Sequence, residues 1–205
     1  MQGYIIDIKT VREDDLIVTI LGENHIYTTY RFYGARHSTI NIGYKIDFEL
    51  ESNLKSTMPR LKDVIQLGFK WILDNQKMYC WQRYIKLFYM HLKDINEIDN
   101  IYFKSLDKLT HKINKQNPKR AIIEHYIKLL EFEGRLHTHM ECLLCDTHIE
   151  NDIALVRSFI PTHPKCSYSQ GFKKQKIDQL FYDKNLISFD EQEVEYLWNL
   201  LLQGL

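Results

Sequence analysis

Three cysteines and one histidine have the types and the spacing of metal ligands. Cys142 and Cys145 form a Cys-x2-Cys pair, and His163 and Cys166 form a His-x2-Cys pair after a further 17 residues. A two-residue gap lets both side chains of one turn reach one ion, and thiolate and imidazole are ligands that zinc favours. The pattern predicts a tetrahedral Zn²⁺ site. Because four protein ligands leave no open coordination position, its expected role is structural.

Other interpretations of these residues stay open. His137, His139 and His148 lie close enough in sequence to compete with His163 for the third ligand position. The first cysteine pair is also compatible with two small buried side chains that bind nothing. A redox role is disfavoured because thioredoxin-like pairs lie in a βαβ pattern that is missing here. Cys80 lies in an apolar helical stretch and is expected to be part of a core.

The segment from His25 to Tyr33 alternates like a half-buried strand and offers a second candidate site. Alternation places two sets of residues on opposite faces: Ile26, Thr28, Tyr30 and Phe32 on one, and Tyr27, Thr29, Arg31 and Tyr33 on the other. With the first face in the core, the second presents two phenol rings around a guanidinium, and Arg36 and His37 follow in the loop. Such a surface suits base stacking and phosphate contact. Packing of the tyrosines against a neighbouring domain is the alternative.

A third candidate surface is a row of lysines. Lys104, Lys108 and Lys112 are four residues apart, so on a helix they form one stripe that can follow a phosphate backbone. Between Lys104 and Arg120 the only acidic residue is Asp107. A solvated helix face, or a site for the acidic tail of a partner protein, would show the same pattern.

The overall charge gives no support to a nucleic-acid partner, because the 27 basic residues equal the 27 acidic ones. The distribution is uneven: residues 61–140 carry 14 basic and 9 acidic side chains, and residues 141–205 carry 6 and 10. The sequence has no Gly-rich phosphate loop, nucleophile elbow or His-Glu-x-x-His motif, so we expect no enzyme. No apolar run approaches a membrane span, and we expect a cytoplasmic protein.

The elements that must position these residues divide into strands and then helices. Residues 4–50 contain four strand-like segments, 4–9, 16–21, 25–33 and 42–50. From Pro59 the apolar period changes to that of a helix, beginning with Leu61, Val64 and Ile65. Helices are predicted at 118–133 and, after a capping box of Ser188 and Glu191, near the end of the chain.

We therefore expect an α+β fold. Residues 1–58 should form a small OB-fold β-barrel, although an SH3-like barrel would show much the same pattern. Residues 59–205 should form an all-helical domain with a zinc-binding insertion at about residues 140–168.

Three segments resemble the bacterial recombination mediator family RecO. The run Arg12–Leu21 is similar to the first turn and second strand of that family, and Tyr30–Ser38 to its strand end and Gly-Ala-Arg loop. The run Leu129–Cys145 is similar to the helix that leads into the metal cluster of the family. Two features depart from the family pattern: the third ligand is His163 where the family commonly has Cys, and few basic residues follow Arg36.

The resemblance implies a function in DNA repair and recombination. Members of the family bind single- and double-stranded DNA, anneal complementary strands, and with RecR help to load RecA onto strands coated by single-strand-binding protein. The implied partners are DNA, RecR and the C-terminal tail of single-strand-binding protein, and no cofactor is consumed. By this resemblance Arg31, Arg36 and His37 would contact DNA. A zinc-stabilised adaptor that binds only proteins is the alternative, and an uncharacterised hydrolase or redox enzyme is a weaker one.

Overall fold

The computed structural model describes residues 1–52 and 57–205. The chain divides into two compact units, Met1–Asn114 and Lys115–Leu205. The predicted division after residue 58 therefore falls inside the first unit. Within the described part of the chain, no helix has the length and apolar character needed to cross a membrane.

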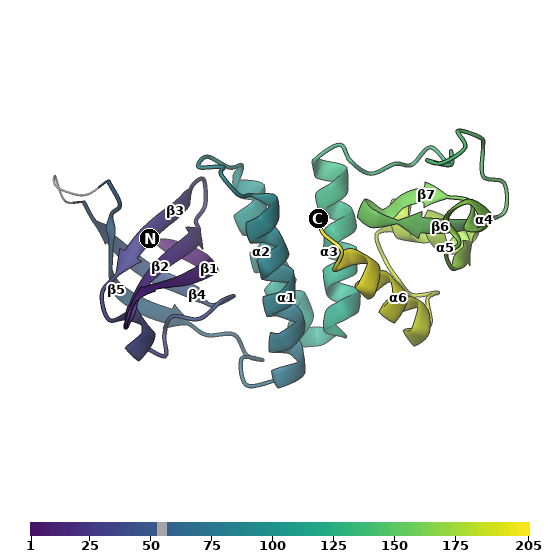
Figure 1. Ribbon diagram of the computed structural model, residues 1–205. Coiled ribbons are helices and arrows are strands. Elements are labelled where there is room, and N and C mark those ends of the chain that lie inside the picture. Colours follow the sequence, from purple (N-terminus) through teal and green to yellow (C-terminus); the bar gives the residue numbers. More distant parts are fainter. Residues whose placement is uncertain (53–56) are drawn as a thin grey trace. The chain divides into compact units, whose positions relative to one another are not determined.

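The first unit begins with a closed five-stranded barrel (Figure 1). Its strands are β1 (Gln2–Arg12), β2 (Asp15–Leu21), β3 (Ile26–Arg31), β4 (Lys45–Glu51) and β5 (Arg60–Leu67). Around the barrel the order is β1-β2-β3-β5-β4, closed by antiparallel pairing of β4 with β1. This order, with one parallel pair between Tyr30 and Arg60, is that of an OB-like barrel. Its interior is apolar, with Ile5, Val18, Ile20, Ile46 and Phe48 almost fully buried.

Strand β5 corrects the prediction that helices begin near Pro59. Asp47 of β4 pairs with Ile65, whereas Glu49 pairs with Lys62, so β5 contains one extra residue between these two pairs. Such a bulge fits the positive φ of 47° at Asp63. An inserted residue breaks the two-residue alternation, and the apolar positions of β5 then recur at a spacing that resembles a helix.

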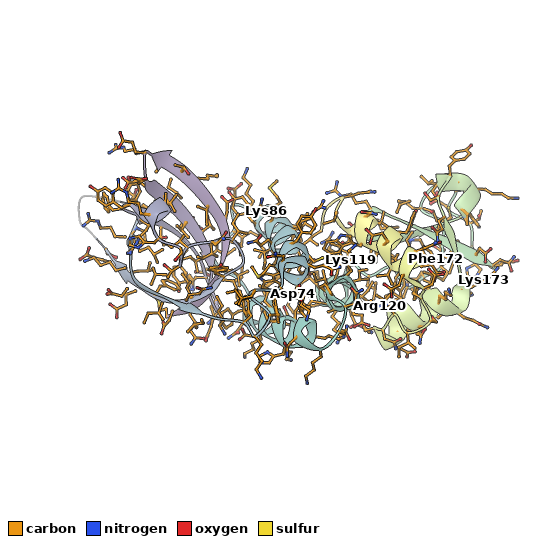
Figure 2. All side chains as sticks on the ribbon, turned by 90° about the horizontal axis from the view of Figure 1, so that it is seen from below. Asp74, Lys86, Lys119, Arg120, Phe172 and Lys173 are labelled. Atoms are coloured by element: carbon orange, nitrogen blue, oxygen red, sulfur yellow. The ribbon has the colours of Figure 1, made fainter. Side chains whose placement is uncertain are left out.

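Two helices complete the first unit: α1 (Asn75–His91) and α2 (Asn100–Lys115). Asp74 begins α1 by accepting the backbone N–H groups of Gln76 and Lys77, each at 3.1 Å, and Figure 2 labels it at that end. Trp81 of α1 packs edge-on against Tyr4 of β1. The indole Nε1 of Trp81 donates to the carbonyl of Gly43 at 2.8 Å, which attaches the helix to the barrel.

The second unit is built on α3 (Pro118–Phe132), which confirms the predicted helix at 118–133. Asn117 caps its first turn with Pro118 at the next position, and Gly134 follows its end with a φ of 68°. Arg120 donates to the carboxylate of Glu191 at 2.7 Å, so the start of α3 is attached to α6 (Glu191–Leu201); Figure 2 labels Lys119 and Arg120.

Between α3 and α6 the chain forms a small sheet that the sequence had not predicted. The order is β7-β6-β8, both pairs antiparallel. Its strands and neighbouring helices are β6 (Asp152–Val156), β7 (Ile160–Thr162), α4 (Pro164–Ser167), β8 (Gly171–Lys173), α5 (Lys174–Asp178) and the π-helical turn η3 (Gln179–Asp183). The second unit therefore consists of helices and a small sheet, and most of this sheet lies in the predicted insertion at about residues 140–168. Three- to five-residue strands are too short for alternation to reveal them.

The cap of α6 also differs from its prediction. Asp190, and not Ser188, accepts the N–H of Glu193 at 2.9 Å, and Glu193 accepts the N–H of Asp190 at 2.9 Å. Both pairs contain a small polar residue followed three positions later by Glu, so spacing alone did not distinguish them.

We predict that Asp190→Ala destabilises the second unit and that Ser188→Ala does not. Loss of an N-cap side chain costs about 1 kcal/mol of unfolding free energy. Ser188 instead contacts the side chain of Gln179 and caps nothing. Urea unfolding followed by circular dichroism measures both variants. Equal losses would contradict the assignment of Asp190 as the cap.

Candidate metal centre and nucleic-acid interface

The first pair of candidate ligands lies in a tight turn before β6. Cys142 donates its N–H to the carbonyl of Thr147 and accepts at its own carbonyl from Asp146, each at 2.9 Å. Asp146 has a φ of 55°, which turns the chain back sharply. Leu143 donates to the carbonyl of Pro161 at 3.2 Å, so the turn is attached beside β7. Local backbone geometry therefore directs both cysteines toward the end of β7.

The second pair lies on one helical turn. His163 directly follows β7, and Cys166 belongs to the short helix α4. The N–H of Cys166 donates to the carbonyl of His163 at 3.0 Å, which closes the turn and brings the two side chains to the same side.

The four predicted metal ligands come together. The ligand atoms of Cys142, Cys145, His163 and Cys166 all lie within 4.8 Å of one another. A Zn–S bond of about 2.3 Å and tetrahedral angles would separate two sulfurs by roughly 3.8 Å. If the distances between the four ligand atoms shortened slightly, all four could coordinate one ion. The arrangement could therefore hold a metal ion, and its thiolate and imidazole donors are those that zinc prefers.

Hydrogen bonds orient the imidazole of His163. Its Nε2 lies 3.3 Å from the backbone oxygen of His148, and a carbonyl only accepts, so Nε2 carries the proton. Nδ1 is then free to bind a metal, and it lies 3.4 Å from the sulfur of Cys145 and 3.9 Å from that of Cys166. His148 contributes only its backbone here. Among the described residues, neither His148, His137 nor His139 joins the ligand group.

The thiols of the cluster differ in acidity. Burial raises the pKa of Cys142, but hydrogen bonds from the backbone N–H groups of His163, Leu144 and Cys145 outweigh it and lower the pKa to about 6. Burial and hydrogen bonding to the other two thiols raise the pKa of Cys166 to about 11. Cys142 is therefore a thiolate at neutral pH and offers the first negative ligand to a cation.

Two residues of the predicted barrel surface point inward. The side chain of Tyr27 packs against the barrel core and meets Phe48 edge-on at 5.9 Å. Arg31 is half-buried, and its Nη1 donates to the carbonyl of Leu61 at 2.8 Å. Between them in β3, Thr29 is completely buried. The assignment of the two faces was therefore reversed: Tyr27 and Arg31 pack toward the barrel, and each keeps only part of its surface exposed.

The predicted DNA-contacting residues that follow β3 lie on the surface. Tyr33, Arg36 and His37 are exposed. The Arg36 guanidinium lies 5.2 Å from the centre of the Tyr33 ring, and its Nε donates to Asp14 at 2.6 Å. An acidic neighbour reduces the charge that Arg36 offers to a phosphate.

The outward face of β3 carries an aromatic and basic cluster that the sequence interpretation missed. The rings of Tyr30 and Phe32 meet edge-on at 4.8 Å, and the guanidinium of Arg60 lies 4.2 Å from the centre of the Phe32 ring. Tyr30 and Phe32 had been assigned to the core as apolar residues. No local signal distinguished the two faces, because each carries one threonine, Thr28 on the outer face and Thr29 on the inner face.

The predicted lysine stripe lies on α2. Lys104 and Lys108 are exposed, and Lys112 is half-buried. Asp107, the one acid of this segment, accepts from Lys45 at 2.7 Å and from the hydroxyl of Tyr4. Because that carboxylate is already paired with residues of the barrel, the outer face of the helix stays basic.

These features define an OB-like barrel protein with basic surfaces in its first unit and a Cys3His cluster in its second. Residues 1–72 match the family model described as RecO N terminal, a segment that contains the whole barrel. Residues 1–72 are therefore similar to the N-terminal part of RecO-family proteins. No curated protein matches the chain.

We predict that His163→Ala lowers the metal content of the purified protein and that His148→Ala does not. His148 contributes its backbone oxygen, which the substitution retains. Cys142→Ser should act like His163→Ala, and Cys80→Ala, in a buried position of α1, serves as the cysteine control. Elemental analysis measures bound metal per chain. Full metal loading of His163→Ala would exclude this histidine as a ligand.

We further predict that Arg31→Ala destabilises the barrel by about 1–3 kcal/mol, because it leaves the buried carbonyl of Leu61 without its side-chain donor. Arg36→Ala should cost about 1 kcal/mol or less, since exposed ion pairs contribute little. Urea unfolding of both variants provides the measurement. A stable Arg31→Ala barrel would show that the guanidinium is not a structural donor.

Proposed function

We propose that this protein is a DNA repair and recombination mediator that binds single- and double-stranded DNA and anneals complementary strands. The observation that carries the proposal is the match of residues 1–72, which form the closed barrel, to the RecO N-terminal family. With RecR, such a protein would help to load RecA onto strands coated by single-strand-binding protein. A RecO-type role would place it with the DNA in the cytoplasm.

Annealing requires that two polyanions approach each other. Cationic side chains that neutralise phosphates release condensed counterions and reduce the repulsion between strands. Lys104 and Lys108 are suited to this because they are exposed and lie one helical turn apart, and the carboxylate of Asp107, which precedes Lys108, is paired with Lys45. Phosphate contacts do not depend on sequence, as a general annealing protein requires.

The proposed metal is a structural Zn²⁺ held by Cys142, Cys145, His163 and Cys166. Four protein ligands fill a tetrahedral shell, so no metal-bound water would be available for hydrolysis. Bound there, the ion would join the turn at Cys142 to the start of α4 and stabilise the second unit. We propose a binding protein and not an enzyme, because the four candidate ligands would be used to hold the ion and would leave no side chain of the cluster to act as a nucleophile or general base.

The second candidate function is a zinc-stabilised adaptor that binds proteins and not DNA. The observation in its favour is that Leu143 and Leu144, in the turn between the first two cysteines, are 52% and 56% exposed. Acidic side chains flank this turn at Glu141 and Asp146. An apolar tip with acidic neighbours suits a basic protein partner better than a phosphate backbone.

We predict that the double variant Lys104→Ala/Lys108→Ala binds DNA more weakly than the wild type does. The loss of affinity should be the same for all DNA sequences. Each phosphate contact contributes about 0.9 to the slope of log affinity against log salt, so loss of two contacts lowers that slope by about 2. Anisotropy of a fluorescent oligonucleotide at several salt concentrations gives the affinity, and mixing of labelled complementary strands gives the annealing rate.

The matched control is Lys86→Ala/Lys93→Ala, which removes the same charge from exposed positions outside the stripe; Figure 2 labels Lys86 on α1. It should keep most of the wild-type slope. Equal effects of the two double variants would assign the binding to net charge alone. Absence of DNA binding by the metal-loaded wild type at low salt would leave only the adaptor.

A further inference from the structure

The three thiols of the candidate metal centre differ in their access to solvent. Cys142 is buried, Cys166 is half-buried, and Cys145 is exposed. Leu143 and Leu144, which precede Cys145 in the turn, are exposed as well. The sulfur of Cys145 is therefore the one of the three that a small solute in water reaches first.

The surroundings of Cys145 suit the ionised form of its sulfur. A cysteine that binds a metal does so as a thiolate, because the ion replaces the proton. The hydroxyl of Thr147 lies 3.1 Å from this sulfur and donates to it when the sulfur is ionised. Peroxides react with thiolates, and exposed thiolates are oxidised before buried ones. Cys145 thus combines the two properties that make a cysteine susceptible to oxidation.

A second thiol lies where it can react with an oxidised Cys145. Cys142 belongs to the same turn, which is closed by the N–H of Asp146 donating to the carbonyl of Cys142 at 2.9 Å. The two sulfurs lie within 4.8 Å of each other. A disulfide bond is about 2.05 Å long, so the sulfurs need to approach by less than about 3 Å. Cys166 belongs to the separate helix α4, so a bond to it has to join two elements.

We propose that Cys145 is a reversible oxidation site, at which a small hydroperoxide such as hydrogen peroxide joins Cys145 to Cys142 in a disulfide. The Cys145 thiolate attacks one peroxide oxygen, the O–O bond breaks, and hydroxide leaves, so that a sulfenic acid forms. The Cys142 thiolate then attacks the sulfur of Cys145, the S–O bond breaks, and a second hydroxide leaves. In sum, two thiolates give up two electrons, and one hydrogen peroxide with two protons becomes two molecules of water.

The disulfide removes two of the four candidate ligands. Its sulfurs carry no charge, and His163 and Cys166 alone do not complete the tetrahedral set of a structural zinc site. The ion would leave, and the link between the turn at Cys142 and the start of α4 would be lost. Thiol reductants reverse the disulfide by exchange, as is usual for redox-sensing disulfides in reducing compartments. The inference rests on the proposed metal site and not on the proposed binding of DNA.

The test treats the zinc-loaded full chain with hydrogen peroxide and follows metal release with a colorimetric chelator. Free thiols are then alkylated and the protein is digested with trypsin. Trypsin separates the cysteines into three fragments: 136–157 with Cys142 and Cys145, 166–173 with Cys166, and 78–83 with Cys80. We expect loss of the bound zinc together with an unalkylated fragment 136–157 that is two hydrogen atoms lighter. The other two fragments should be alkylated, and dithiothreitol with added zinc should restore the metal content.

The matched variants are Cys145→His and Cys166→His, which both leave two cysteines and two histidines, a ligand set that also holds zinc. Cys166→His retains the reactive pair and should lose its metal to peroxide as the wild type does. Cys145→His lacks the exposed thiol and should keep its metal under the same treatment. If Cys145→His binds no zinc at the outset, the fragments of the wild type decide the question.

Three outcomes overturn the inference: Cys145 remains alkylated while the zinc stays bound, the disulfide joins fragment 166–173 to fragment 136–157, or zinc-loaded Cys145→His loses its metal as readily as the wild type. Each of these leaves the proposed metal site and the proposed binding of DNA intact. A wild-type protein that binds no zinc at all overturns both the metal site and the inference.

Discussion

The surface that the barrel offers depends on one constraint, the alternation of side chains along a strand in a closed sheet. A barrel of five strands has a narrow interior, so each strand must place small or well-packed residues on its inner face. In β3 the inner position belongs to Thr29, which is fully buried and donates to the carbonyl of Val18 at 2.9 Å. Once Thr29 points inward, Tyr30 and Phe32 must point outward. A shift of the pairing register of β3 by one residue would exchange its inner and outer faces.

The same constraint explains why an arginine lies partly inside. Arg31 shares the inner parity of Thr29, and its aliphatic part can pack while its guanidinium donates to Leu61 at the end of the strand. The cost of burying a cation is reduced because it lies near the barrel end and has a carbonyl acceptor. Its role is therefore to join β3 to β5.

The candidate metal ligands of the second unit are positioned by local turns. Two short turns, one before β6 and one formed by α4, bring four ligand atoms within 4.8 Å. Hydrogen bonds from backbone N–H groups stabilise the thiolate of Cys142, and the carbonyl of His148 fixes the tautomer of His163. A centre of this kind is prepared before any cation arrives, because the backbone has already oriented its donors.

The sequence by itself determined the features that depend on local spacing. The four ligands, the helix at 118–133 and the lysines of α2 follow from offsets of two, three and four residues, and all lie where those offsets place them. Tertiary structure decided the face of β3, the bulged strand β5 and the small sheet of the second unit. Each of these depends on a partner far away in the chain: Leu61 for Arg31, β4 for β5, and β8 for β6. Alternation gives two faces but not which one is buried, because that choice is made by the strands that close the barrel.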